Sequence, residues 1–279
     1  MYLKFGFIIY LLLSSSIYAM PAFVSTKWLS KNYANPNLVI IDVRKSELYN
    51  KGHLKHAVNM PVFKDLFDTH NKYMMPKLDF LQKLFSKAGI NKDAKVVVYG
   101  GNQLIWAARF YWVSKVLGHK EVTLLKVGYG NWKKGFLPIS TTLYKPKPKN
   151  FIPRINNNII ETKLSTFIAI GKDTILDGRP PKFYEGLKSH AKRFGHIPTA
   201  LNYPGSNNYD INGSGMKDIS QLKNLYKNLP KNRKIILYCE DGADAALNFL
   251  VLKDLGYKAS VYDGSWLEWG NDSNLPIEK

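Results

Sequence analysis

Short runs of β-branched and other apolar residues recur along the chain and indicate buried strands. Three of them, residues 39–41, 96–99 and 235–238, are apolar throughout and do not alternate with polar residues. A strand that is apolar on both faces is typical of a parallel sheet with helices on both sides. The pattern therefore predicts a parallel sheet in each half of the chain.

Between these runs, apolar residues return at helical spacing. Residues 80–88 and 219–228 predict amphipathic helices. Residues 107–117 and 245–255 predict helices that follow a strand directly, and each is followed by a glycine that can cap it, Gly118 or Gly256. Strand, tight loop, helix and strand in succession is the pattern of a doubly wound α/β sheet.

The two halves of the chain repeat each other in four separate segments. An Asp-x-Arg motif, a Gly-His turn leading to Ala-x-Asn-x-Pro, an apolar strand ending in Tyr, and a Gly-rich turn ending in Trp each occur twice. The copies lie about 140 residues apart, so the repeated unit is a domain and not a solenoid turn. The segments are residues 42–44, 52–61, 95–99 and 128–132 in the first copy, and 177–179, 195–204, 234–238 and 262–266 in the second.

This repeat divides the chain into two related domains. We expect an N-terminal domain at residues 20–143 and a C-terminal domain at residues 159–279, each a mostly parallel sheet flanked by helices. Residues 144–158 are expected to form the linker. It starts with a Pro/Lys-rich run, residues 144–150, whose composition predicts a semi-extended, solvated chain.

Residues 1–19 resemble an export signal. Lys4 supplies a short positive region, and the apolar run at residues 5–13 is too short to span a bilayer. A polar stretch then leads to Ala19, where we expect cleavage. The prediction is an exported protein, periplasmic or secreted, with no stable membrane anchor after cleavage. An uncleaved anchor or a buried helix is the alternative interpretation.

Composition narrows the classes of protein. Hydrophobic residues make up 45% of the 279 residues and charged residues 22%, which excludes wholesale disorder and a protein with several membrane spans. The formal net charge is +19, a balance that favours anionic partners. The lysines are scattered and no nucleic-acid-binding motif accompanies them, so we interpret them as a solvated surface and expect no nucleic-acid partner.

The chain has one cysteine, Cys239, and its position is informative. A single cysteine excludes an intramolecular disulfide and a Cys-rich zinc site. Cys239 comes directly after a predicted strand and before a predicted helix, at the edge of the sheet where α/β proteins place their sites. Backbone N–H groups there can form a nest for an anion, which favours a thiolate nucleophile. A buried cysteine without function is the alternative.

Over residues 25–276 the chain resembles the tandem-domain rhodaneses, which are the thiosulfate and 3-mercaptopyruvate sulfurtransferases. The resemblance is carried by the two Asp-x-Arg motifs, the two Gly-His turns with Ala-x-Asn-x-Pro, the Cys239 loop, and residues 263–269, which are close to the family's C-terminal signature. As in the family, only the second domain keeps the cysteine, because Gly100 stands at the matching position of the first.

The resemblance implies a ping-pong reaction and no metal or organic cofactor. Cys239 takes a sulfur from a small anionic donor, becomes a persulfide, and passes the sulfur to a thiol or to cyanide. The backbone of the loop would hold the negative charge; it consists of Cys239 and the five residues Glu240, Asp241, Gly242, Ala243 and Asp244. Arg179, Lys182 and Arg193 are the basic residues that could neutralise the donor. Asp177 and Arg179 are expected mainly to hold the strand end against the loop, and Trp266 is expected to be a core aromatic near the site.

The loop departs from the family pattern in its charge. Thiosulfate-type members carry basic residues after the cysteine, and mercaptopyruvate-type members carry small neutral ones, whereas this chain has Glu240, Asp241 and Asp244. Three carboxylates should raise the pKa of the thiol and repel a dianionic donor. Lys182 stands near the place of the family's donor-binding arginine and does not reproduce its bidentate contact. The natural donor therefore stays open.

Other readings of the same residues are weaker. A rhodanese-like phosphatase needs an arginine six positions after the cysteine, where this chain has Ala245. His53 and His196 are expected to make structural hydrogen bonds in the two Gly-His turns and not to bind a metal. An exported, non-catalytic binding or sulfur-carrier module is the alternative to an enzyme.

Overall fold

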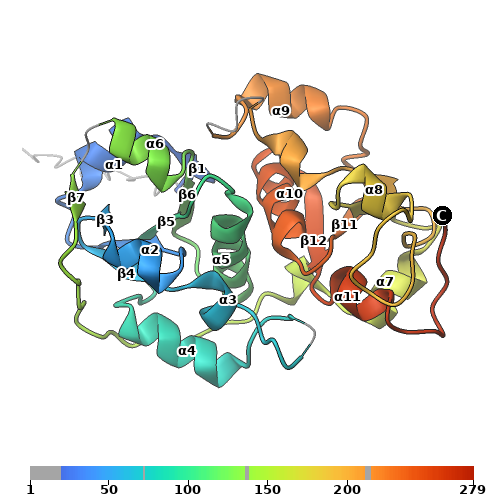
Figure 1. The fold of residues 1–279 in the computed structure, drawn as a ribbon, viewed down its shortest axis with the longest axis horizontal. Helices are drawn as coiled ribbons and strands as arrows, with labels where there is room; N and C mark the ends of the chain where they lie inside the picture. The colour runs from blue at the N-terminus through green and yellow to red at the C-terminus, as the bar shows by residue number, and fades with distance from the viewer. Residues whose placement is uncertain (1–19, 72, 136–137, 211–214) are drawn as a thin grey trace, which may run out of the picture.

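The computed structural model describes residues 20–71, 73–135, 138–210 and 215–279, and the predicted export signal lies outside them. Two α/β domains lie side by side (Figure 1). The first is a five-stranded sheet in the order β1, β6, β5, β2, β4, and every neighbouring pair is parallel. Its strands are β1 (Phe23–Val24), β2 (Leu38–Asp42), β4 (Ala57–Asn59), β5 (Lys95–Tyr99) and β6 (Val122–Leu125).

Six helices and a small ribbon complete the described part of the N-terminal domain. The helices are α1 (Thr26–Asn32), α2 (Ser46–Asn50), α3 (Val62–Asp65), α4 (Leu78–Lys87), α5 (Ile105–Val116) and α6 (Tyr129–Lys134). The antiparallel ribbon pairs β3 (His53–Leu54) with β7 (Ile139–Ser140).

The second domain repeats the sheet with the same topology. Its order is β10, β9, β11, β12, β8, again parallel throughout. The strands are β8 (Ile160–Glu161), β9 (Thr174–Asp177), β10 (Leu201–Asn202), β11 (Lys234–Tyr238) and β12 (Lys258–Tyr262). The helices are α7 (Lys163–Ala169), α8 (Pro181–Tyr184), α9 (Ile219–Leu225), α10 (Ala243–Asp254) and α11 (Ser265–Trp269), with 3₁₀ turns η1 (Asn157–Ile159) and η2 (Gly205–Asn208).

The duplicated register confirms the expected α/β fold. In the first sheet Asp42 of β2 lies opposite Tyr99 of β5, and in the second Asp177 of β9 lies opposite Tyr238 of β11. The chain leaves β5 at its carboxyl end and enters α5, and it leaves β11 in the same way and enters α10. The duplication therefore places two equivalent loops at two equivalent sheet edges.

The predicted helices are present with small differences at their ends. The helix predicted at residues 80–88 is α4, and the two that follow the central strands are α5 and α10. Gly118 and Gly256 adopt left-handed backbone conformations with φ of +81° and +82°, as helix C-terminal caps require. The helix predicted at residues 219–228 ends earlier, at Leu225.

The domains share an interface and a core. Helices α5 and α10 face each other between the two sheets (Figure 1), and one cluster of buried apolar residues contains members of both, such as Phe110 and Leu247. Hydrogen bonds also cross the interface: the Ile105 amide donates to the Tyr209 hydroxyl at 3.1 Å. The N-terminal domain is thus positioned to contribute to a site in the other.

The linker, residues 144–158, follows the N-terminal domain. Its first residues are mostly exposed, whereas Phe151 is buried. The Arg154 amide donates to the carbonyl of Leu117 at 2.9 Å, just beyond the end of α5.

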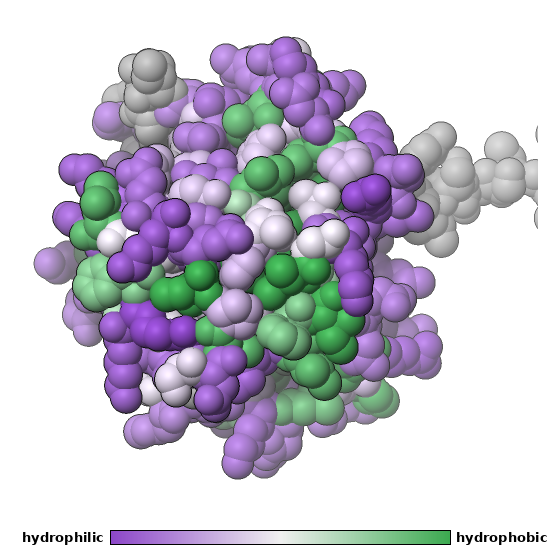
Figure 2. Space-filling view, turned by 90° about the vertical axis from the view of Figure 1, so that its right-hand side faces the viewer, coloured by the Kyte–Doolittle hydropathy of each residue, from purple (hydrophilic) through white to green (hydrophobic). Residues whose placement is uncertain are grey.

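Figure 2 shows the end of the molecule that the C-terminal domain forms, where apolar side chains gather among polar ones. Exposed apolar residues of this domain include Leu164, Phe167 and Ile168 of α7. Within the described residues, no helix is both long and apolar enough to cross a membrane.

Candidate active site

Cys239 is the first residue after β11, and the loop of residues 239–242 leads directly into α10. The strand before it is buried, so the chain arrives in the interior. Gly242 turns the chain with a φ of +89°, a conformation that favours glycine. A Cβ atom at Gly242 would also lie 2.8 Å from Nη1 of Arg109, which comes from the other domain. The turn thus needs glycine for two independent reasons.

The sulfur of Cys239 lies inside this turn. The Gly242 amide donates a hydrogen bond to Sγ at 3.1 Å, so a loop N–H faces the sulfur. The backbone of Cys239 is held on both sides, because its amide donates to Oγ of Ser265 at 3.2 Å and its carbonyl accepts from the Trp266 amide at 2.9 Å. The residue is 0% exposed.

Burial decides the ionisation of the thiol. It raises the pKa of Cys239 well above its ordinary value, and the nearby carboxylates of Asp241 and Asp244 raise that pKa further. Hydrogen bonds from the backbone of Ala245 and Asp241 oppose this without reversing it. The expected lowering of the thiol pKa is therefore not found; burial and these two carboxylates favour the neutral thiol.

Two of the three loop carboxylates lie beside the thiol. Oδ1 of Asp241 is 4.0 Å from Sγ and also accepts the Ala243 amide at 3.2 Å. Asp244 packs so closely on Gly205 that a Cβ atom there would be 2.3 Å from its Oδ1. Burial raises the pKa of Asp244 to about 7, and Asp241 adds to the effect.

Glu240 turns away from the thiol, toward basic residues. Its Oε2 lies 4.0 Å from Nη1 of Arg179, and its Oε1 lies 3.6 Å from Nδ1 of His190. The side chain is 18% exposed, and both oxygens are buried without a hydrogen-bond partner in the described chain. Burial raises the pKa of Glu240 to about 7, against the opposing charge of Arg179. Glu240 therefore acts on Arg179 and His190, whereas Asp241 and Asp244 act on the thiol.

Arg179 and Asp177 tie the end of β9 to the loop. The Nη2 atom of Arg179 lies 2.6 Å from Oδ2 of Asp177 and also donates to the carbonyl of Gly195 at 2.8 Å. Its guanidinium lies over the ring of Trp266, 4.3 Å from the centroid. One nitrogen, Nη1, is buried without a hydrogen-bond partner among the described atoms and faces Glu240. The ion pair is structural, and one nitrogen is left over for the site.

The other residues of the predicted site are spread more widely. The guanidinium of Arg193 donates to four carbonyl oxygens, which holds the segment after α11. Lys182 is exposed on α8. Trp266 is buried, and its Nε1 donates to Oγ of Ser189 at 3.1 Å. Of the two basic residues, Lys182 presents its charge to solvent, whereas the charge of Arg193 is taken up by backbone carbonyls.

Comparison with known proteins decides the family. The family model described as Rhodanese-like domain matches residues 25–135 and again residues 162–272. The chain belongs to the rhodanese family. It is 34% identical to the thiosulfate sulfurtransferase of Corynebacterium glutamicum, covering 94% of this chain and 92% of that one. It is 32% identical to the sulfur carrier protein TtuD of Thermus thermophilus, covering 94% and 98%.

Solved structures agree with this assignment. The crystal structure of SseA from Escherichia coli, described as a 3-mercaptopyruvate sulfotransferase, superposes with a TM-score of 0.79 at 25% identity and covers 88% of this chain and 99% of that one. The paired rhodanese domains and the sulfurtransferase relatives make this chain a sulfurtransferase.

The rhodanese site contains functional residues that the sequence alone did not reveal. Arg109 of α5 reaches across the interface, and its Nη1 forms an ion pair with Asp263. Asp263 also accepts the Met75 amide at 2.6 Å, so two segments of the N-terminal domain meet at one carboxylate beside the Cys239 loop. The Nη2 atom of Arg109 is buried and has no hydrogen-bond partner within the described residues. A lone arginine inside the apolar run of residues 107–117 was the available signal.

The histidines of this rhodanese take the structural role predicted for them. Nδ1 of His53 is 2.9 Å from the carbonyl of Tyr49, and Nδ1 of His196 is 2.8 Å from the carbonyl of Tyr184. The ring of His53 also stacks on Tyr49, and the ring of His196 stacks on Tyr184. Across the described ranges, no group of three or more His, Cys, Asp or Glu residues is placed to hold a metal ion.

Proposed function

We propose that this sulfurtransferase prefers a singly charged donor of the 3-mercaptopyruvate type over thiosulfate. The observation that carries the proposal is the placement of Asp241 and Asp244 beside the sulfur, with Oδ1 of Asp241 4.0 Å from Sγ. A dianion such as thiosulfate must approach a buried thiol against these carboxylates. A monoanion meets less repulsion.

Proton balance favours the same donor. Cys239 is a neutral thiol, so its proton must leave when the sulfur attacks. With 3-mercaptopyruvate, the Cys239 sulfur bonds to the donor sulfur, the carbon–sulfur bond breaks, and its electron pair passes to carbon as pyruvate enolate. The enolate takes up the proton that Cys239 gives up. With thiosulfate, the sulfur–sulfur bond breaks, its electron pair leaves with sulfite, and the Cys239 proton passes to sulfite, a weaker base than the enolate carbon.

The second half-reaction returns the enzyme to its starting state. A thiol acceptor attacks the outer sulfur of the Cys239 persulfide, the sulfur–sulfur bond breaks, and the acceptor leaves as a persulfide while Cys239 regains its proton. The Gly242 amide, 3.1 Å from Sγ, stabilises negative charge on the sulfur in both steps.

Two guanidinium nitrogens are suited to hold the donor carboxylate. Nη2 of Arg109 and Nη1 of Arg179 are buried, and neither has a hydrogen-bond partner in the described residues. They come from opposite domains and lie on either side of the Cys239 loop. Arginine is a strong carboxylate ligand. Nη1 of Arg179 faces Oε2 of Glu240 at 4.0 Å, so the donor carboxylate would compete with Glu240 there.

The test is steady-state sulfur transfer to cyanide with the two donors side by side. We expect a higher kcat/KM with 3-mercaptopyruvate than with thiosulfate, and no turnover with either in Cys239→Ser. The variant Asp241→Asn should raise the thiosulfate rate more than the mercaptopyruvate rate. A wild-type enzyme faster with thiosulfate would overturn the donor preference.

A sulfur-carrier role is the second candidate, because one relative of similar length is named a sulfur carrier protein. A carrier would accept one sulfur on Cys239 and release it slowly to small thiols. A persulfide that forms within seconds and then resists excess glutathione would favour this reading. Rapid loss of the sulfur to glutathione, with turnover, would favour the enzyme.

We also propose that the protein is exported, on the strength of the short positive and apolar segments in residues 1–19. Amino-terminal sequencing of the protein made by its natural host tests this. A mature chain that begins near residue 20 supports export, and an intact Met1 in the cytoplasmic fraction contradicts it.

A further inference from the structure

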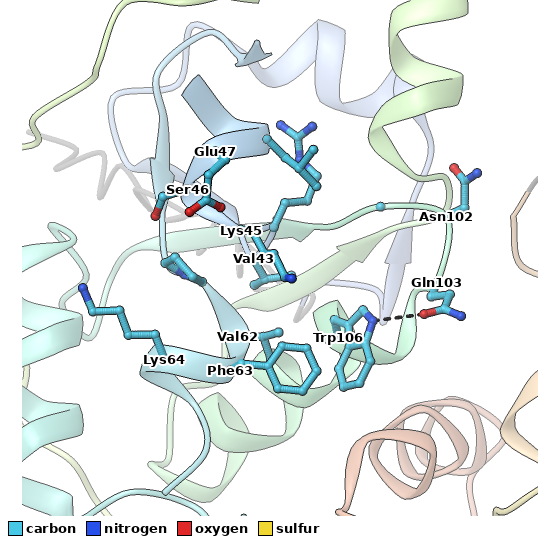
Figure 3. Close-up of a pocket in the computed structure, with 14 residues that line it drawn as sticks. Val43, Lys45, Ser46, Glu47, Val62, Phe63, Lys64, Asn102, Gln103 and Trp106 are labelled. Carbon is cyan, nitrogen blue, oxygen red and sulfur yellow. Dashed lines mark hydrogen bonds between the residues drawn. The ribbon is translucent and has the colours of Figure 1, made fainter. Parts of the chain in front are cut away.

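The N-terminal domain contains a cavity of about 640 Å³ at the sheet edge that matches the active site of the other domain. Its lining comes from the loops and first helical turns that follow β2, β4 and β5, the counterparts of β9, β10 and β11. Figure 3 shows the lining side chains around the opening. The matching site of the N-terminal domain therefore has Gly100 in place of the cysteine and a cavity beside it.

The C-terminal domain is more closely packed at the matching residue. There, Asp244 packs against Gly205, the residue that follows Pro204. In the N-terminal domain the residue after Pro61 is Val62, and the cavity remains open beside it. A Cβ atom at Gly101 would meet no atom within 4 Å, so the space extends to the backbone of the degenerate loop.

One wall of the cavity is aromatic and accessible. The rings of Phe63 and Trp106 lie 4.6 Å apart, centroid to centroid, and Figure 3 places them side by side at the cavity. Phe63 is 41% exposed, and Leu48, which also lines the cavity, is 48% exposed. Aromatic side chains that line a concave surface without being buried are typical of a site for a small organic ligand.

The charged groups around the opening are mainly basic. Arg44, Lys45 and Lys64 line the cavity, against the single carboxylate of Glu47. Neither lysine has a described carboxylate within ion-pairing distance, and both are exposed. Arg44 is held in place by Asp42, with 2.6 Å between Nη2 and Oδ2. Fixed and free cations beside an apolar wall suit an anion with a flat apolar body.

We propose that this cavity is a binding site for small aromatic carboxylates. The ring lies against Phe63 and Trp106, and the carboxylate faces Lys45 and Lys64. The site performs no sulfur chemistry, because Gly100 stands where the other domain has Cys239. It is therefore distinct from the donor site, and its existence does not depend on which donor the enzyme uses.

The test is fluorine NMR with 4-fluorophenylacetate as the probe, on full-length mature wild-type protein and on Cys239→Ser. We expect both proteins to bind it with a dissociation constant of about 1 mM or tighter, the range that ligands of this size reach. The uncharged analogue 4-fluorophenylacetamide should bind about fivefold more weakly or worse, the effect of a lost charge contact. Equal binding of the two compounds would overturn the proposal.

Two variants locate the site. Lys45→Gln combined with Lys64→Gln should weaken the binding of 4-fluorophenylacetate about fivefold. The matched control combines Lys172→Gln with Lys227→Gln, both exposed and outside the cavity lining, and should leave the binding unchanged. Gly101→Leu should block binding by filling the space. All four lysines are exposed, so the double variants should fold, and thermal melting checks this. No binding to wild type, or unchanged binding in Gly101→Leu, would contradict the proposal.

Discussion

In the N-terminal domain Arg44 pairs with Asp42 at 2.6 Å, and in the C-terminal domain Arg179 pairs with Asp177 at the same distance. Each arginine also donates to the glycine carbonyl of its Gly-His turn, and an asparagine of the next strand donates to the backbone of each motif. The two networks agree atom for atom. The framework has been kept in both copies, although only one copy has chemistry.

The copies differ in the loop that the framework supports. The loop between β5 and α5 consists of residues 100–104, and the loop between β11 and α10 consists of residues 239–242. The first loop is therefore one residue longer. Gly100 opens the first loop and Cys239 the second. In the helices that follow, the shared Ala-Ala pair is succeeded by Arg109 in α5 and by Leu247 in α10.

This difference shows how a duplicated domain can change role while its fold is retained. The N-terminal copy has Gly100 in place of the nucleophile and carries Arg109, which pairs with Asp263 next to the active loop. The sheet framework resides in what the copies share, whereas the nucleophile and the interdomain ion pair reside in what they do not share. Substitutions that make one copy resemble the other test this division.

The largest effect is expected from Arg109→Leu, which makes α5 match α10. It leaves Asp263 buried without its partner, and breaking a buried ion pair in this way costs about 3–5 kcal/mol of unfolding free energy. We also expect sulfur transfer to fall, because the loop loses the neighbour against which Gly242 packs. Urea unfolding and steady-state kinetics measure the two effects.

A second substitution separates charge from packing. In Arg109→Leu combined with Asp263→Asn, no unpaired charge remains, so we expect most of the lost stability to return while activity stays low. If the single variant is destabilised by less than about 1 kcal/mol, the value of an exposed pair, the interdomain ion pair does not have the role assigned to it.

An intermediate effect is expected at the helix caps. Gly118 and Gly256 have matching left-handed conformations, but a Cβ atom at Gly118 would lie 2.2 Å from the carbonyl oxygen of Arg154, whereas one at Gly256 would meet nothing within 4 Å. Gly256→Ala should therefore cost only the backbone strain, about 1–2 kcal/mol. Gly118→Ala should cost roughly twice as much, because the linker must also move. Equal losses in thermal or urea unfolding would refute the packing of the linker on α5.

The smallest effect is expected from Asp244→Asn and depends on pH. Burial holds the pKa of Asp244 at about 7 in the folded protein, above its unfolded value. The folded state therefore binds a proton that the unfolded state has released, and stability falls as pH rises from about 4 to 7. Asp244→Asn should flatten this fall and raise Tm at pH 8 relative to wild type.

The same variant changes the thiol. Without the Asp244 charge the pKa of Cys239 is lowered, so alkylation by iodoacetamide at pH 8 should become faster. Asp93→Asn, at an exposed carboxylate of the other domain, is the control and should change neither quantity. A thiol that alkylates more slowly in Asp244→Asn would contradict the electrostatic account of the loop.

The sequence was sufficient for the framework and insufficient for the state of the thiol. The apolar runs and the duplicated motifs predict the strands and helices because local patterns record which faces are buried. The burial of Cys239 and the reach of Arg109 to Asp263 depend on how two domains pack, which no local pattern records. For the same reason the three loop carboxylates looked alike in the sequence, whereas in space Glu240 faces Arg179 and only Asp241 and Asp244 act on the thiol.

The central claim is that Cys239 alone carries sulfur and that the N-terminal copy only supports it. Intact mass spectrometry of the protein after brief exposure to 3-mercaptopyruvate, without an acceptor, tests this most directly. We predict that wild type gains one sulfur atom, removable by dithiothreitol, and that Cys239→Ser gains none while folding normally. The variant Arg109→Leu should gain the same sulfur more slowly. Addition of sulfur to Cys239→Ser, or a folded wild type that takes up none from either 3-mercaptopyruvate or thiosulfate, would contradict the account.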